Sequence, residues 1–99
     1  RLYQIPYRDI VYMESRRRVI HLFGRNGEEY RFYKKMKDLL EEISHTGNMF
    51  IRVHCSYVVN YYYIKSLSST EAELLTGEKL PVSGEYKNEA LKKFMGMME

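Results

Sequence analysis

Three consecutive arginines, Arg16, Arg17 and Arg18, are the side chains in this sequence best suited to binding an anion. A guanidinium group presents a planar fork of donors that fits phosphate oxygens and the N7 and O6 atoms of guanine. Charge runs more often keep a surface turn soluble, so both interpretations stay open from the run alone. The net charge is only +3, with 16 Lys and Arg against 13 Asp and Glu, so the clustering is more informative than the total.

A second group of polar side chains, Arg52, His54 and Ser56, alternates with apolar residues in the segment 49–59. Successive side chains of a straight strand point to opposite faces. The alternation therefore places these three on one polar face, free for solvent or a ligand. The same pattern predicts that Cys55 turns inward beside Val53.

The titratable residues do not form a catalytic or metal-binding constellation. The sequence has three histidines and one cysteine, without a His-x-x-x-His pair, and a Cys-rich zinc site needs more thiolates. Cys55 as a nucleophile would need a base, but its neighbour His54 points the other way on a strand. A hydrogen-bonded structural role is the first interpretation of His54. We expect no metal, no cofactor and no enzymatic activity.

Composition indicates one folded domain over residues 1–99. Hydrophobic residues make up 44% of the chain and charged residues 29%, which is typical of a globular fold. No apolar run approaches the roughly 20 residues of a membrane-spanning helix, so we expect no membrane partner. The first residues resemble neither a signal peptide nor an initiator Met. We therefore expect a piece of a longer cytoplasmic protein.

The first third of the chain is predicted to form three strands. Segments 9–14 and 19–23 are short, apolar and rich in β-branched and aromatic residues, and 15–18 is predicted to be the loop between them. Asn26-Gly27 is a strong signal for a tight hairpin turn, which the strand 28–33 follows.

A change of period then predicts a helix over about 34–45. Met36, Leu39, Leu40 and Ile43 are spaced to form one apolar helical face, and Gly47 is predicted to end the helix in a left-handed conformation. The segment 49–59 is too β-rich for a helix, and 61–64 is ambiguous between a helical turn and a strand.

The last third is predicted to hold a hairpin and a closing helix. Strands over 67–75 and 78–82 flank Thr76-Gly77, and Pro81 indicates a sheet edge or a strand end. Ser83 is predicted to cap a helix that starts near residue 85. That helix is expected to bury Leu91 and Phe94, with Met95 and Met98 as further candidates.

Three segments together resemble the LytTR (LytR/AlgR-type) domain of bacterial two-component response regulators. They are 9–14, 50–60 and 80–86, and the Arg-x-His-x-Ser-Tyr-x-Val-Asn core of the middle one is the most specific. The resemblance implies a mainly β fold, with small antiparallel sheets stacked into an elongated body. It also implies the amphipathic helix over about 34–45 and a short C-terminal helix. Compared with the family, the first strand of the domain looks truncated here.

The resemblance also implies a function. LytTR domains typically follow a phosphoacceptor receiver domain and act as its transcriptional output. They read double-stranded DNA with loops that enter successive major grooves at direct repeats. We therefore expect sequence-specific DNA binding, with a dimer on DNA in the full-length protein and a receiver domain upstream.

The expected DNA contacts follow where positions match the family. One contact region is the loop after residue 14, another is the position after His54, and a third follows Ser83. The residues predicted to contact DNA are Arg16, Arg17, Arg18, Arg52, His54, Cys55, Ser56, Tyr86 and Lys87.

Cys55 is where this sequence departs from the family. The family usually has Arg, Asn or Lys there, facing DNA, whereas a thiol is a weak donor that cannot make a bidentate base contact. Exposure of Cys55 requires a bend near His54 that breaks the alternation, and we favour this over the inward orientation. The alternative function is a protein-interaction module that uses Tyr- and Met-rich surfaces, since the chain has ten Tyr and six Met.

Overall fold

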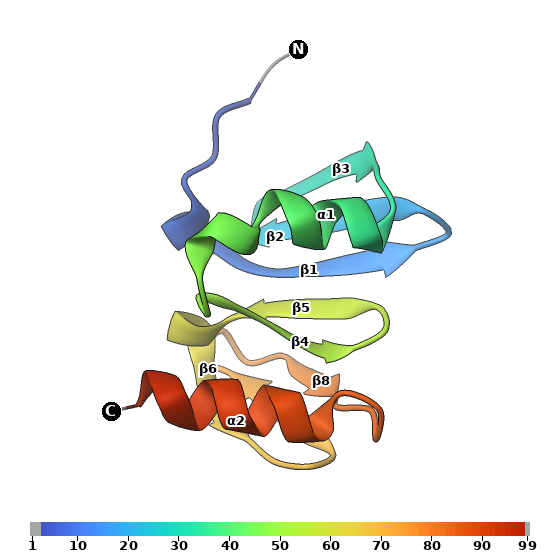
Figure 1. The fold of residues 1–99 in the computed structure, drawn as a ribbon. Coiled ribbons are helices and arrows are strands. Elements are labelled where there is room, and N and C mark those ends of the chain that lie inside the picture. Colours follow the sequence, from blue (N-terminus) through green and yellow to red (C-terminus); the bar gives the residue numbers. More distant parts are fainter. Residues whose placement is uncertain (1–2, 99) are drawn as a thin grey trace.

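The computed structural model describes residues 3–98, which fold into two antiparallel sheets and two helices (Figure 1). The five-stranded sheet has the order β3-β2-β1-β5-β4, and the three-stranded sheet has the order β6-β7-β8. The body is elongated, at 38 × 25 × 25 Å. The mainly β fold and the two helices are as predicted, while the predicted domain limits at residues 1 and 99 lie outside the described residues.

The elements are β1 (Ile10–Arg16), β2 (Val19–Gly24), β3 (Glu29–Tyr33), α1 (Met36–Glu42), β4 (Phe50–His54), β5 (Tyr57–Asn60), β6 (Ile64–Leu67), β7 (Glu71–Leu74), β8 (Lys79–Pro81) and α2 (Lys87–Met97), with short 3-10 helices η1 (Tyr7–Asp9), η2 (Ser44–Thr46) and η3 (Tyr61–Tyr63).

The large sheet has a hydrophobic core on each face. Alternate residues of its central strands point to opposite sides, and nearly all of them are apolar. On one face Met13, Ile20 and Val58 pack with Leu39 and Ile43 of the α1 region. On the other face the inner strands pack against the small sheet and α2, where Ala90 is buried.

Local turn signals predicted two hairpins correctly. The β2–β3 turn contains Asn26-Gly27, and the β7–β8 turn contains Thr76-Gly77. Gly27 and Gly77 have φ angles of 85° and 105°, a region that suits glycine because it lacks a Cβ. Pro81 ends the edge strand β8, where its missing N–H breaks no ladder.

Three predicted boundaries in the sheets were wrong. The segment 49–59 forms two strands joined by a turn at Cys55-Ser56, and β1 continues to Arg16 instead of ending at residue 14. The predicted strand 67–75 is interrupted, because Ser68 accepts backbone bonds from Thr70 and Glu71 in a turn between β6 and β7. The ambiguous segment 61–64 forms η3 and then enters β6.

Both helices are shorter than predicted. α1 ends at Glu42, and Gly47, with φ 69°, follows η2 instead of capping α1. α2 starts at Lys87, and the backbone carbonyl of Ser83, not its hydroxyl, accepts the N–H groups of Tyr86 and Lys87. The expected burial of Leu91 and Phe94 is partial.

Met95 and Met98 are not part of the core, contrary to expectation. They are 60% and 64% exposed. Ala90 takes the central position of the α2 contact instead.

Candidate nucleic-acid interface

The β1–β2 turn carries the arginine run at its tip. Arg16 and Val19 are cross-strand partners, so Arg17 and Arg18 alone form the two-residue turn. Their φ angles are 51° and 67°, the left-handed conformation that a tight type I′ hairpin turn requires at both positions. Both side chains are exposed. The structure thus corrects the predicted four-residue loop to a tight two-residue turn with two exposed guanidinium groups.

Arg16 differs from its two neighbours because it belongs to β1. Its Nε lies 3.2 Å from a carboxylate oxygen of Glu14, and its side chain is 55% exposed. Glu14 also accepts a hydrogen bond of 3.2 Å from the hydroxyl of Tyr57 on β5. Burial and the nearby Glu14 carboxylate raise the pKa of Tyr57 above its ordinary value of 10.0, so its proton stays in this bond.

The β4–β5 turn is a second projecting hairpin with Cys55 and Ser56 at its tip. The Arg52 guanidinium folds over the turn and donates to the backbone oxygens of His54 (3.3 Å) and Cys55 (2.9 Å). Nδ1 of His54 accepts the backbone N–H of Ser56 at 3.1 Å, which confirms the hydrogen-bonded structural role. The neutral ring then carries its proton on Nε2, which leaves that N–H as a donor.

Cys55 is exposed at this tip, whereas Val53 is fully buried. The alternation that predicted an inward Cys55 was wrong, because the turn starts after His54 and ends the strand. The exposed position matches the one implied by the resemblance. The sulfur lies 3.5 Å from Nδ1 of His54 and 3.7 Å from the hydroxyl of Ser56.

The third predicted contact region is attached to the second. The backbone N–H of Ser83 donates to the carbonyl of Val53 at 2.9 Å, which ties the β8–α2 connection to β4. The Arg52 guanidinium lies 4.4 Å from the ring centroid of Tyr86, a cation–π distance. Lys87 is the first residue of α2 and is partly exposed.

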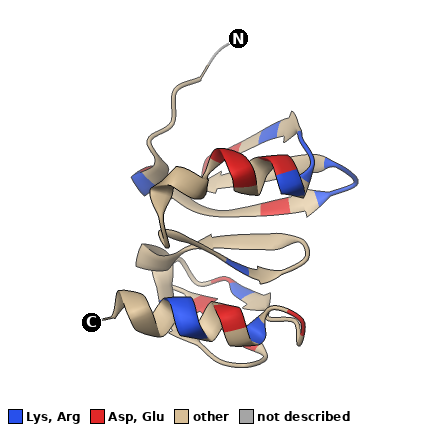
Figure 2. Ribbon diagram, viewed as in Figure 1, with Lys and Arg blue, Asp and Glu red and all other residues tan. Residues whose placement is uncertain are grey.

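The two hairpin turns are also connected to each other. The backbone N–H of Ser15 donates to the carbonyl of Ser56 at 2.9 Å. The β1–β2, β4–β5 and β8–α2 connections lie at the same end of the molecule (Figure 1). Figure 2 shows Lys and Arg in the β1–β2 turn, on β4 ahead of the β4–β5 turn and at the start of α2. All nine residues predicted to contact DNA are therefore on or beside three neighbouring connections.

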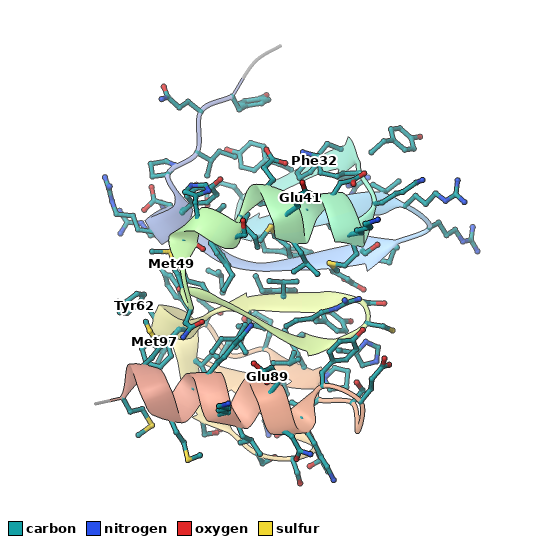
Figure 3. All side chains as sticks on the ribbon, in the orientation of Figure 1. Phe32, Glu41, Met49, Tyr62, Glu89 and Met97 are labelled. Atoms are coloured by element: carbon teal, nitrogen blue, oxygen red, sulfur yellow. The ribbon has the colours of Figure 1, made fainter. Side chains whose placement is uncertain are left out.

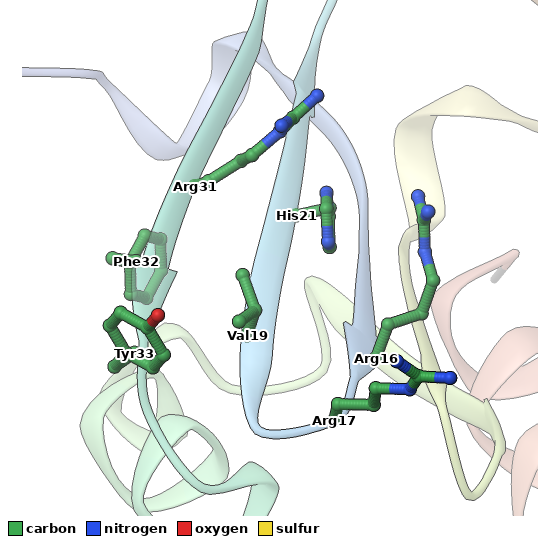
Figure 4. A pocket seen from close by; sticks show the side chains of 7 residues that line it. All are labelled: Arg16, Arg17, Val19, His21, Arg31, Phe32 and Tyr33. Carbon is green, nitrogen blue, oxygen red and sulfur yellow. The ribbon is translucent and has the colours of Figure 1, made fainter.

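Arg31 on β3 was not predicted as a site residue, although it lies beside the β1–β2 turn. A hollow of about 740 Å³ beside the β1–β2 turn is lined by Arg16, Arg17, His21 and Arg31, among others (Figure 4). The signal was available, because the hairpin at Asn26-Gly27 fixes the register that places Arg31 opposite His21.

Two other kinds of function, metal binding and membrane insertion, can be checked on the described residues. Within residues 3–98, no group of three or more His, Cys, Asp or Glu side chains is arranged to hold a metal ion. The same stretch contains no helix with the length and apolar character needed to cross a membrane.

Comparison with known proteins identifies the family. The family model described as the LytTr DNA-binding domain matches residues 1–95. The chain belongs to the LytTR family. LytTR is a family of DNA-binding domains and not a family of enzymes. Comparison with curated protein sequences gave no significant match.

A solved structure confirms the fold of this LytTR domain. It is the LytTr DNA-binding domain of a putative methyl-accepting/DNA response regulator from Bacillus cereus, with a TM-score of 0.75. The two sequences are 23% identical, and the match covers 93% of this chain and 85% of the other. At that identity the similarity shows the LytTR fold, as predicted, and does not assign individual contacts.

Proposed function

We propose that this LytTR domain binds double-stranded DNA sequence-specifically in the major groove, as the output domain of a cytoplasmic transcriptional response regulator. The observation that carries the proposal is the position of the tight Arg17-Arg18 turn beside the β4–β5 turn. The major groove is about 12 Å wide and admits a two-stranded β-ribbon. Each hairpin tip has that shape.

The side chains divide into two kinds of contact. Arg17 and Arg18 have exposed guanidinium groups, which suit guanine N7 and O6 or two phosphate oxygens. Nε2–H of His54 and the hydroxyl of Ser56 are neutral donors that suit phosphate positioning. Lys87 adds a charge beside them.

Arg52 and Tyr86 act differently in this proposal. The guanidinium of Arg52 is occupied by two backbone oxygens and by the Tyr86 ring, so it holds the β4–β5 turn in shape. Cys55 faces DNA but makes no bidentate base contact. Base reading then depends mainly on the β1–β2 turn.

The assembly in the full-length protein is part of the same proposal. Two LytTR domains on direct repeats, joined through upstream receiver domains, contact successive major grooves as a dimer. Such an arrangement doubles the number of phosphate contacts and steepens the dependence of affinity on salt.

The rival function, a protein-interaction module, is favoured by one observation. Tyr62, Met95 and Met98 are each at least 60% exposed. Tyr62 lies at the end of the molecule opposite the β1–β2 turn, near the last residues of α2 (Figure 3). Because the two surfaces are at opposite ends, substitutions can test them separately.

The test is selection of bound duplexes from a random DNA pool, followed by a salt titration on the selected sequence. Neutralisation of about four phosphates predicts a slope of roughly −4 in log affinity against log salt. Methylation of guanine N7 should interfere with binding if the major groove is read. Failure to enrich any sequence, or a flat salt dependence, would leave the protein-interaction module as the better account.

A further inference from the structure

Beside the arginine turn, one face of the large sheet presents charged side chains, of which Arg16 and Arg31 are exposed, Glu14 is half-buried and His21 is buried. Glu14, His21 and Arg31 are cross-strand neighbours on β1, β2 and β3, with Arg16 one step nearer the turn. This register places their side chains on one face of the sheet, and Figure 4 shows those of Arg16, His21 and Arg31. Arg16, His21 and Arg31 also line the hollow beside Arg17.

The outermost charges of this face are positive. Arg16 and Arg31 side chains are 55% and 69% exposed, whereas the carboxylates that contact them, Glu14 and Glu29, are 16% and 32% exposed. Both arginines use Nε for these contacts, at 3.2 and 3.0 Å. Their terminal amino groups make no hydrogen bond to any residue between 3 and 98 and are free for another anion. Glu29 is also hydrogen-bonded to Nδ1 of His21, at 2.8 Å.

The distance from the turn tip sets which part of a DNA duplex this face would meet. His21, the cross-strand partner of Arg31, is three residues beyond Arg18 along β2. At about 3.3 Å per residue, Arg31 lies roughly 10 Å behind the tip. The major groove is about 8.5 Å deep. A tip that reaches the groove floor therefore brings Arg31 level with the phosphates at its edge.

We propose that the exposed arginines on this face of β1, β2 and β3 bind the phosphodiester backbone along the groove that the β1–β2 turn enters. Arg31 is the main new contact, with Arg16 beside it. The proposal rests on the DNA binding proposed above and adds a contact outside the three connections of that site. The contact is to phosphate, so it contributes affinity without reading sequence.

Arg31→Gln tests this contact, with Arg25→Gln as the matched control. Arg25 lies in the β2–β3 turn at the opposite end of the same hairpin, and its 55% exposed side chain is also ion-paired, to Asp9 at 3.3 Å. Both variants and Arg31→Lys are compared with the unmodified protein on the selected duplex and on a scrambled duplex. Thermal melts establish that each variant is folded.

One lost phosphate contact reduces the salt slope by about 0.9, which corresponds to a loss of about fivefold in affinity at 0.15 M salt relative to 1 M. We expect this loss for Arg31→Gln on both duplexes, little change for Arg25→Gln, and a retained slope for Arg31→Lys. An Arg31→Gln slope equal to that of Arg25→Gln overturns the proposal, and so does a loss confined to the selected duplex. If Arg17 and Arg18 substitutions weaken binding while Arg31→Gln does not, only this inference fails. If the unmodified protein binds neither duplex, the proposed function fails with it.

Discussion

Replacing Arg17 by Asn and Arg18 by Gly should make the domain more stable and its DNA binding weaker. Both arginines have positive φ angles, 51° and 67°, which cost a residue with a Cβ roughly 1–2 kcal/mol. Asn-Gly is the preferred pair for such a turn. Glycine in turn lowers the stability by about 0.5–1 kcal/mol, because it loses more conformational freedom on folding than other residues do. The net expected gain is about 1 kcal/mol.

That gain is measurable as a melting temperature. For a domain of this size, about 1 kcal/mol shifts the thermal midpoint by roughly 4–8 °C. The assay is thermal unfolding followed by circular dichroism, with Arg25→Gln as a control that leaves the β1–β2 turn unchanged. A lower melting temperature in the double variant would refute the argument from the backbone conformation.

The same variant should lose at least about tenfold in DNA affinity, since a good bidentate base contact contributes about 1–3 kcal/mol. The measurement is a titration of the selected duplex at constant salt. A more stable domain that binds this duplex as tightly as before would exclude the β1–β2 turn from the interface. The opposite signs of the two effects separate loss of contact from loss of fold.

Three further predictions concern other residues. Leu39→Ala should destabilise the domain by about 2–5 kcal/mol in a denaturant melt, and Leu40→Ala by clearly less, because Leu39 is 3% exposed and Leu40 only partly buried. Cys55 should react with iodoacetamide in the free domain and be protected by bound DNA, and Cys55→Arg should tighten binding; a thiol that reacts only after unfolding contradicts its exposed position. Hydrogen bonds from His21 and Arg31 lower the pKa of Glu29 below its ordinary value of 4.5, so its contribution to stability is present above that pH and is lost as the pH falls through the lowered value. Acid unfolding of Glu29→Gln should lack this part of the pH dependence, and an unchanged acid profile would contradict it.

Local chemistry made part of the fold predictable from sequence. Asn26-Gly27 and Thr76-Gly77 contain residues that adopt positive φ angles, so the turns could be recognised without knowledge of the tertiary structure. The apolar face of α1 followed from helical spacing, with Leu39 and Ile43 buried as expected. The three contact segments came from the family resemblance instead.

Other features carried no recognisable signal in the sequence. The turn at Cys55-Ser56 has no Gly, Asn or Pro, and the Arg52 and His54 side chains stabilise it by binding its backbone. The end of α2 gave an amphipathic pattern, but Met95 and Met98 are exposed. Arg31 acquires its position through strand pairing, so finding it required working out the register of the hairpin at Asn26-Gly27.

The most direct test of the account is an NMR titration of the ¹⁵N-labelled domain with the selected duplex. The account predicts that amide shifts change at Arg17, Arg18, Cys55 and Ser56 and at the start of α2, with Tyr62 at the opposite end unaffected. Shift changes concentrated at Tyr62 and the last turn of α2, with the two hairpin tips unchanged, would contradict it.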